Sequence, residues 1–388
     1  FCYTWFMKIA TNVHRDAFGG ITISNLALFN WLEKKEDTIV GIEFITSRHV
    51  FGPSIFRHFD PLFFRHHIIN GIDIIPRLPW EKAWNRDALR QRWDVLVETT
   101  KEVLRREVPD VVLLNGTYYA PWILATAAQE LGIPTVLRYA GVLQREVNPH
   151  TGYFTRRRLL AYERWIASMA DAIIYPSSLC RSVVETDILG HAATHATVIP
   201  NPVEAHGLLA RRLVGRYTIA AVGRWSRIKN FQAFVTLHED LLAERWPHRA
   251  MLVTSYRDRK FHIPETIERT DPMSYEDLQK FFRSINLLVV PSHFETFCNV
   301  AAEAVVLGTS VLVSENVGFS EILRKAGLGR MVIKNFDDPA RVVTAVKRLA
   351  QTRLLKKEQA AVAKLLESHI VHHRILAVLQ SVLKRSVA

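Results

Sequence analysis

Short apolar runs alternate with stretches of helical spacing along the first half of the chain. Runs rich in Val, Ile and Leu predict strands buried on both faces, as in a parallel sheet that is covered by helices. The predicted strands lie at 8–13, 39–45, 110–114, 134–138 and 172–176. Apolar positions at helical spacing predict helices over 21–33, 120–131 and 156–169.

The same alternation restarts after an extended segment at 198–203, which contains Pro200 and Pro202. Prolines in an extended stretch favour a domain boundary. Beyond it, strands are predicted at 218–222, 250–254, 287–290 and 310–313, and helices at 231–244, 274–284 and 300–307. We therefore predict two doubly wound α/β domains, 7–200 and 201–369, with a helix over 370–388 returning toward the first. Such domains bind ligands beyond the carboxyl ends of their strands, so the active site is expected in the cleft between them.

Composition narrows the class of protein. Of the 388 residues, 48% are hydrophobic, and no apolar run reaches the ~18 residues that span a bilayer. The three cysteines are widely spaced and show neither a disulfide framework nor a zinc pattern, which favours a reducing, cytoplasmic compartment. Residues 1–6 lack the features of a signal peptide, and Met7 looks like a natural start.

The formal net charge of +12 is concentrated in the second half. Residues 1–203 carry 22 Lys/Arg and 20 Asp/Glu, whereas residues 204–388 carry 28 and 18. A basic domain suits a nucleotide diphosphate, a nucleic acid or an acidic membrane surface, and charge alone does not choose among them.

One segment combines a strand end, a loop and a helix start. The predicted strand ends at Pro291, Glu295 lies in the loop, and a helix begins near Cys298 or Asn299 with Glu303 inside it. The start of a helix offers unpaired backbone N–H groups to a diphosphate, and carboxylates accept strong hydrogen bonds from sugar hydroxyls. The alternative is an ordinary helix with one exposed and one capping glutamate.

Two further strand-to-helix loops carry candidate binding residues. Arg224 and Lys229 follow the strand at 218–222, and such cations can clamp phosphate; the alternative is a solvated basic loop. Gly19 and Gly20 follow the first strand, where glycine lets the backbone approach a ligand; the alternative is a tight turn.

Together these segments resemble glycosyltransferase family 4, which has the GT-B fold. Glu295 and Glu303 match its Glu-x7-Glu motif, Arg224 and Lys229-Asn230 its Gly-Arg and Lys-Asn motif, and Gly19-Gly20 its N-terminal glycine pair. Residues 198–203 are similar to its interdomain segment, with Pro202 in place of a glycine, and residues 170–177 resemble a further segment of the family. The resemblance covers nearly the whole chain from Met7.

The resemblance implies a retaining, metal-independent hexosyltransferase that uses a nucleotide-sugar donor, and a UDP- or GDP-sugar is expected. Arg224 and Lys229 would bind the diphosphate, Glu303 the ribose and Glu295 the donor sugar. The catalytic assignments are Glu295, Arg224 and Lys229. Gly19 and Gly20 would approach from the other domain, and the donor-side backbone is assigned to Phe297, Cys298, Asn299 and Val300. No cofactor beyond the donor is implied, and no Asp-x-Asp metal site occurs.

The sequence departs from the family pattern at Ala140, which stands where many members have a histidine near the sugar. Arg138, Tyr139 and Asn115 are therefore candidate acceptor or sugar-site residues. Glu321 matches a donor-side loop, where it would contact the nucleotide or cap the next helix.

The acceptor is expected to be a saccharide, a lipid or a small molecule in glycan or glycoconjugate biosynthesis. Aromatic and basic residues mix over 50–69, which suits peripheral membrane contact; the alternative is a helical pair with its aromatics packed inward. Other functions remain as hypotheses: a nucleotide-sugar-binding protein without transferase activity, or a basic nucleic-acid-binding protein. No nucleic-acid module is recognisable, so no nucleic-acid partner is expected.

Overall fold

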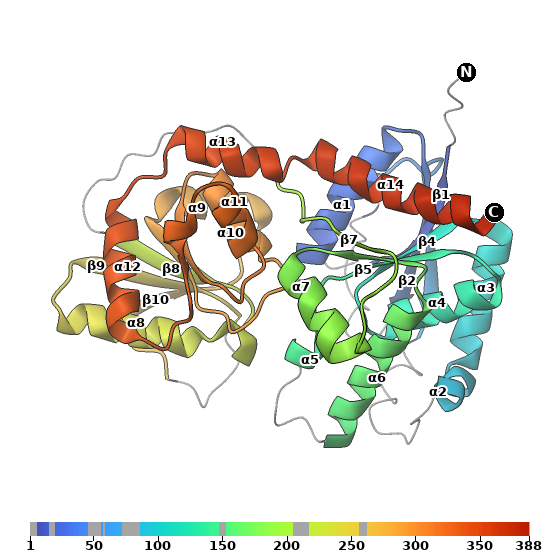
Figure 1. Cartoon of the computed structure of the whole chain (residues 1–388), viewed down its shortest axis with the longest axis horizontal. Coiled ribbons are helices and arrows are strands. Elements are labelled where there is room, and N and C mark those ends of the chain that lie inside the picture. Colours follow the sequence, from blue (N-terminus) through green and yellow to red (C-terminus); the bar gives the residue numbers. More distant parts are fainter. Residues whose placement is uncertain are drawn as a thin grey trace. The chain divides into compact units, whose positions relative to one another are not determined.

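The structure is a computed structural model, and it describes residues 6–14, 20–45, 56, 59–71, 86–146, 153–204, 217–255 and 262–387. The chain forms two α/β units (Figure 1). The first contains the described residues up to Pro176, together with Arg181–Ile199 and the segment from His369. The second contains Ser177–Cys180 and Pro200–Ser368.

A parallel sheet forms the centre of the first unit, with the order β3-β2-β1-β4-β5-β6-β7. Its strands are β1 Lys8–Asn12, β2 Thr38–Ile45, β3 Phe64–Asn70, β4 Val111–Asn115, β5 Thr135–Arg138, β6 Ala172–Tyr175 and β7 Ala196–Val198. Its helices are α1 Gly20–Glu33, α2 Arg86–Arg92, α3 Asp94–Glu107, α4 Tyr119–Glu130, α5 Leu143–Glu146, α6 Tyr153–Met169, α7 Ser178–Val183, the π-helix η2 Val184–Leu189 and α14 Ser368–Val387. Every strand pair is parallel, as the buried apolar runs predict.

One face of the first sheet is covered by helices that are distant in sequence. Leu28 and Phe29 of α1 share a core with Val371, Ile375 and Leu379 of α14. Helix α3 packs against α4, and α4 packs against α6. The last helix is therefore part of the core of this unit.

The prediction for residues 50–69 was partly wrong. Residues 46–55 and 57–58 lie outside the described residues, but Phe64–Asn70 is a strand, β3, rather than part of a helical pair. The aromatic side chains do point inward, because Phe56, Phe59 and Phe64 are buried against Phe29. The backbone N–H and C=O groups of β3 hydrogen-bond with β2, and these rings fill the core.

The second sheet is also wholly parallel, with the order β10-β9-β8-β11-β12-β13. Its strands are β8 Tyr217–Val222, β9 His248–Val253, β10 Ile267–Thr270, β11 Leu287–Val290, β12 Ser310–Ser314 and β13 Val332–Ile333. Its helices are η3 Arg227–Lys229, α8 Phe231–Ala243, α9 Tyr275–Ser284, α10 Asn299–Val306, α11 Ser320–Lys325, η4 Gly329–Met331, α12 Pro339–Gln351 and α13 Lys356–Leu365.

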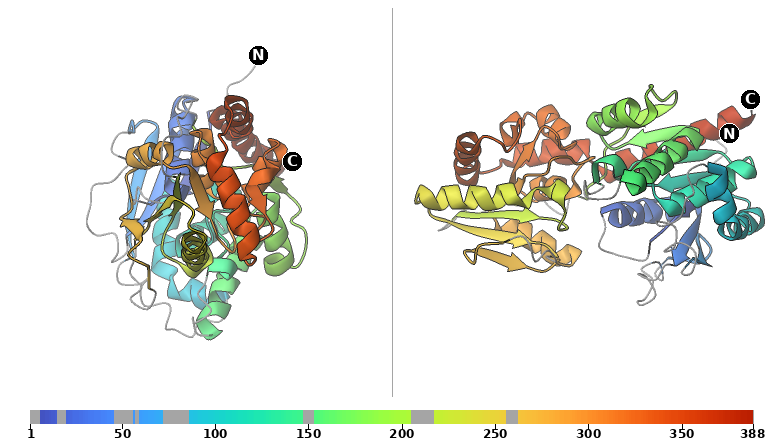
Figure 2. Two further views of the ribbon diagram at one scale, coloured as in Figure 1. Left: turned by 90° about the vertical axis from the view of Figure 1, so that its left-hand side faces the viewer. Right: turned by 90° about the horizontal axis from the view of Figure 1, so that it is seen from below.

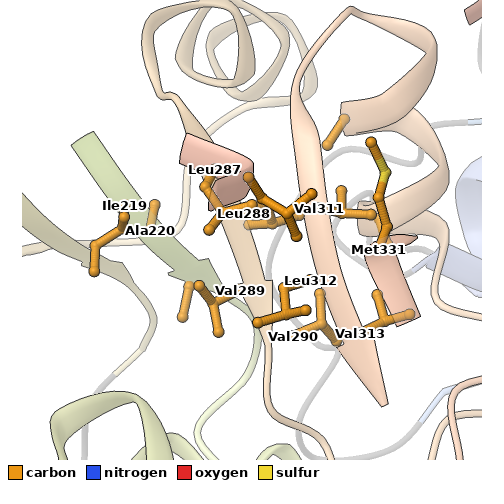
Figure 3. Packing of buried hydrophobic residues seen from close by; sticks show 14 of the residues in the cluster. Ile219, Ala220, Leu287, Leu288, Val289, Val290, Val311, Leu312, Val313 and Met331 are labelled. Carbon is orange, nitrogen blue, oxygen red and sulfur yellow. The ribbon is translucent and has the colours of Figure 1, made fainter. Parts of the chain in front are cut away.

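The centre of the second sheet is filled by branched aliphatic side chains. Figure 3 shows those of β8, β11 and β12 interleaved beside Met331. Helices α8 and α12 pack together, and Figure 2 shows them side by side in front of the strands. Helix α10 packs on α9 and α13. Loops follow the carboxyl ends of the strands, and most of these loops lead to helices.

Strand order fixes where a ligand site can form. In each sheet, successive strands wind outward in opposite directions from a central pair, which is β1 and β4 in the first unit and β8 and β11 in the second. A crevice opens beyond the carboxyl ends of such a pair, where neighbouring loops diverge. The Arg224 loop follows β8 and the Glu295 loop follows β11, so both candidate loops meet at this point.

Candidate active site

Two backbone-directed hydrogen bonds join the loops that follow β8 and β11. The backbone N–H of His293 donates to the carbonyl of Ile228 at 2.8 Å, and Asn230 Nδ2 donates to the carbonyl of Pro291 at 3.1 Å. Asn230 adopts a left-handed conformation with φ 49°, which ends η3 and starts α8. These contacts bring the residue before Asn230, Lys229, to the Glu295 loop.

Lys229 and Glu295 form an ion pair, in which Nζ donates to Oε1. Ser292 Oγ donates to the same oxygen at 2.9 Å. The side chains of Lys229 and Glu295 are 21% and 15% exposed, so both are mostly withdrawn from water but reachable. Burial alone would lower the pKa of Lys229, but the Glu295 carboxylate and the nearby Cys298 offset it and leave the pKa raised. The ammonium group therefore stays charged.

The backbone of Glu295 is fixed by a third loop. Its N–H donates to the carbonyl of Asn316 at 3.1 Å, and its carbonyl accepts from Gly318 N–H at 3.0 Å. A Cβ at Gly318 would lie 2.2 Å from the carbonyl oxygen of Thr296 and 2.5 Å from Ser177 Oγ. Only glycine fits here, so the approach of this loop to the Glu295 segment depends on it.

Helix α10 begins where the sequence predicts. Asn299 is its first residue, and Cys298 precedes it in a left-handed conformation with φ 87°. The thiol is buried, which raises its pKa to about 12, and Glu295, Lys229 and Glu303 all act on it electrostatically. Cys298 therefore links the Glu295 loop to the helix that carries Glu303.

Glu303 lies one turn into α10 and is partly buried. Burial raises the pKa of its carboxyl to about 7. Tyr275, the first residue of α9, has a raised pKa because of burial and of the neighbouring Glu303. Tyr275 and Ser292 were not among the residues predicted from the sequence. Their positions at a helix start and just after Pro291 are the only signals for them.

The structure also describes the remaining predicted residues of the second unit. Arg224 is exposed and acts electrostatically on Lys229. The Phe297 side chain is buried and its carbonyl accepts from Phe319 N–H at 2.8 Å, while Asn299 Oδ1 accepts from Asn201 Nδ2 at 2.8 Å. Val300 is partly buried in the first turn of α10. Asn299 and Val300 are the first two residues of this helix, and Phe297 lies two residues before it.

Glu321 corrects one prediction. Its carboxylate accepts hydrogen bonds from the backbone N–H groups of Ser178 and Leu179, at 3.0 and 2.7 Å. It therefore caps α7 rather than the helix that follows it in sequence, and α11 already contains it. Residues 177–180 belong to the second unit, and Ser177 Oγ also donates to the Thr296 carbonyl at 2.6 Å.

The predicted residues of the first unit are mostly engaged in its own packing. Gly19 lies outside the described residues, and Gly20 is the first residue of α1. Asn115 Nδ2 donates to Thr11 Oγ1 at 2.8 Å. Arg138 is buried at the end of β5 and donates to Asn25 Oδ1 at 3.0 Å and to Ser24 Oγ. Tyr139 is 1% exposed. A role of Asn115, Arg138 and Tyr139 toward an acceptor stays a prediction.

Two family models match the chain in succession. Residues 69–202 match a glycosyl transferase 4-like domain, and residues 216–352 match the model of glycosyl transferases group 1. The chain belongs to the group 1 glycosyltransferases. The second match contains every predicted donor-site residue of the second unit.

Curated relatives of this group 1 glycosyltransferase are distant. A lipopolysaccharide core biosynthesis mannosyltransferase of Rhizobium leguminosarum bv. viciae is 25% identical over 190 residues, 46% of this chain and 54% of the relative. A glycogen synthase of Mycobacterium tuberculosis is 25% identical over 261 residues, 60% of this chain and 61% of the relative. The chain thus spans between about half and three fifths of the length of these relatives.

Solved structures extend the likeness to the whole fold. A sucrose-phosphate synthase from Thermosynechococcus elongatus has a TM-score of 0.74 at 19% identity, covering 98% of this chain and all of that one. A trehalose-phosphate synthase from Burkholderia xenovorans has a TM-score of 0.68 at 14% identity, covering 97% and 99%. At these identities the likeness shows the fold, which is the GT-B arrangement of two Rossmann-like domains.

The described residues contain neither a metal-binding cluster nor a membrane-spanning helix. No group of three or more His, Cys, Asp or Glu side chains in those residues is arranged to hold a metal ion. Among the same residues, no helix combines the length and apolar character needed to cross a membrane.

Proposed function

We propose that this chain is a retaining, metal-independent glycosyltransferase, which moves a sugar from a nucleotide-diphosphate sugar to an acceptor. The observation that carries the proposal is the cluster at the switch point of the second sheet. Lys229 pairs with Glu295 in the loop before α10, and Glu303 lies one turn into that helix. A cation paired with one carboxylate, followed by a helix start with a second carboxylate in the helix, is suited to a diphosphate flanked by two sugars.

The expected chemistry depends on stabilising a leaving group. When the bond to the donor sugar breaks, negative charge develops on the nucleotide diphosphate. Lys229, kept charged by Glu295, and the exposed guanidinium of Arg224 would oppose that charge, together with the α10 N-terminus. Glu303 would accept hydrogen bonds from the ribose and Glu295 from the donor sugar. Gly19 and Gly20 stay candidates for contact from the first unit.

The donor and acceptor classes are proposed from the relatives. Two of the relatives are a mannosyltransferase and a glycogen synthase, so we expect hexose transfer from a UDP- or GDP-sugar. A saccharide, lipid or small-molecule acceptor would meet the first unit, and peripheral membrane contact is part of this proposal. We also propose a cytoplasmic protein without a nucleic-acid partner.

A donor screen tests the proposal. Thermal unfolding is measured with UDP-, GDP-, ADP- and TDP-sugars, because a ligand that binds the native state stabilises it by mass action. One nucleotide should raise the unfolding temperature selectively. No shift with any of them would rule out the donor site.

Product formation tests the reaction itself. Candidate acceptors are incubated with the selected donor, and NMR then reports whether the anomeric configuration is retained. Excess EDTA should leave the rate unchanged. Donor binding without acceptor-dependent product would instead favour a nucleotide-sugar-binding protein that lacks transferase activity.

A further inference from the structure

A second basic site lies beside β13, which is an edge strand of the second sheet. A cavity of about 430 Å³ opens between β13 and α12. Three arginines line it, Arg330, Arg341 and Arg348, and its apolar lining includes Val332, Ile333 and Ala345. The volume lies within the range of small-molecule sites. None of the residues that form the candidate active site contributes to this lining.

The arginines come together because of helix periodicity. Arg341, Ala345 and Arg348 are spaced by four and three residues along α12, so they share one face of that helix. Arg330 reaches the same space from η4, immediately before β13. Arg348 Nη2 donates to the carbonyl of Arg330 at 3.1 Å, which holds the two residues beside each other.

The positive charge around the cavity is only partly balanced. Arg330 pairs with Glu358 at 2.8 Å. Among the described residues, neither Arg341 nor Arg348 lies within ion-pair distance of a carboxylate, and Asp338 is used at the start of α12, where it accepts from Arg341 N–H at 3.1 Å. Two guanidinium groups are therefore available to an anion, and they account for part of the charge excess of residues 204–388 that the donor site does not use.

The lining indicates the class of ligand. One guanidinium group can donate two parallel hydrogen bonds to two phosphate oxygens. Several arginines around one cavity therefore favour a dianionic phosphate over a single carboxylate. The apolar lining of Val332, Ile333 and Ala345 suits the carbon skeleton of a small molecule. No aromatic side chain is among the described residues that line the cavity, so it offers no stacking surface for a nucleobase.

We propose that this cavity binds the phosphate monoester of a small, non-nucleotide ligand such as a sugar phosphate. The site is separate from donor binding and does not require the proposed transferase function. Arg341 and Arg348 hold the phosphate, and the apolar lining contacts the attached carbon skeleton.

Calorimetric titration of the full chain tests the proposal with three probes: glucose 6-phosphate, inorganic phosphate and glucose. Glucose 6-phosphate should bind most tightly, inorganic phosphate more weakly and glucose not measurably. Arg341→Ala and Arg348→Ala should each weaken glucose 6-phosphate binding roughly tenfold, and Arg348→Lys by less, because lysine keeps the charge but loses the paired contact.

Matched variants separate this cavity from other cationic sites. Arg353→Ala removes the same charge from an exposed residue outside the lining and should leave binding unchanged. Lys229→Ala should also leave it unchanged, because that residue belongs to the donor site. Equal binding of glucose, an equal loss in Arg353→Ala, or loss in Lys229→Ala with retention in Arg341→Ala would each overturn the proposal. Circular dichroism of each variant verifies that the fold is intact.

Discussion

Lys229 donates to the carboxylate of Glu295 although 66 positions separate the two residues in sequence. Each follows one of the two central strands of the second sheet, and the bonds of His293 and Asn230 hold their loops together. The pair is therefore a consequence of strand order as much as of charge. It keeps a largely buried amine protonated at the place where a diphosphate is expected.

Replacing Lys229 by Ala should abolish the thermal shift caused by the selected nucleotide sugar. Loss of one charge-assisted contact to phosphate weakens binding by about 10- to 100-fold. The matched control is Lys347→Ala, which removes a lysine that is similarly exposed and is paired with Glu244. A wild-type shift in Lys229→Ala, together with a wild-type shift in Glu303→Ala, would mean that the assigned pocket is wrong.

Nucleotide-sugar affinity should rise with pH through about 7. Burial raises the pKa of Glu303 to about 7, and only its ionised form is a pure acceptor for ribose hydroxyls. Between pH 6 and pH 8 the dissociation constant should fall roughly tenfold, as the carboxyl loses its proton. Calorimetry over this range measures the effect. In Glu303→Gln the affinity should be lower and independent of pH, and a slope equal to that of the wild type would contradict the assignment.

A second buried carboxyl should shape the pH dependence of stability. Glu163 of α6 is fully buried, and burial raises its pKa to about 7 despite hydrogen bonds from the N–H groups of Leu143 and Gln144. Because its pKa in the folded state exceeds the unfolded value near 4.5, the native state holds the extra proton between these values. The free energy of unfolding therefore falls as pH rises from about 4.5 to 7.

The contribution of Glu163 is about 3 kcal/mol across that window, from a shift of this size. Urea unfolding at intervals from pH 4.5 to 8 should show Glu163→Gln with a correspondingly smaller fall than the wild type. Parallel curves for the two proteins would show that Glu163 does not titrate in this range.

Gly318 should tolerate no side chain. An alanine Cβ would meet the carbonyl oxygen of Thr296 and Ser177 Oγ, so Gly318→Ala should lower the free energy of unfolding by about 1–3 kcal/mol. It should also weaken nucleotide-sugar binding, because Gly318 N–H supports the Glu295 carbonyl. Gly329→Ala is the matched control, since a Cβ there meets no atom within 4 Å. If both variants were equally stable, close packing at Gly318 would be excluded.

Substitutions at Cys298 should separate the effect of backbone conformation on stability from the effect of the side chain. At φ 87° a β-branched residue is strained, whereas glycine is not. Cys298→Val should destabilise the second unit by about 1–2 kcal/mol or more, and Cys298→Gly should change stability by less than about 1 kcal/mol. Urea midpoints compare the two. Greater stability of the valine variant would show that buried apolar volume, rather than conformation, decides this position.

The sequence predicted most strands because parallel strands buried on both faces are continuous apolar runs, as in Leu287–Val290 of β11. Strand β3 escaped prediction because it lies at the edge of its sheet, and its polar run Arg65-His66-His67 interrupts the apolar residues. Its composition therefore resembles a basic surface segment as much as a strand.

The residues of the candidate site also differ in how far the sequence predicts them. Lys229 and Glu295 were predictable because each lies in a strand-to-helix loop, and loops after neighbouring strands meet. The partner of Glu321 was not, because the helix that it caps lies 143 positions earlier in sequence. Asn115 likewise has the polar character of a ligand-binding residue, but its amide bonds to Thr11 of the adjacent strand. Long-range hydrogen bonding of this kind leaves no local pattern.

The last helix bears on how the chain is made. Val371, Ile375, Leu379 and Val382 of α14 complete the core that begins with β1, whereas the second unit is almost entirely continuous in sequence. The first unit therefore lacks its final hydrophobic layer until the end of the chain has been made, whereas the second unit has its whole sequence by residue 368. A chain truncated after residue 368 would thus carry a complete second unit attached to a first unit with an uncovered apolar face, a species that is expected to recruit chaperones.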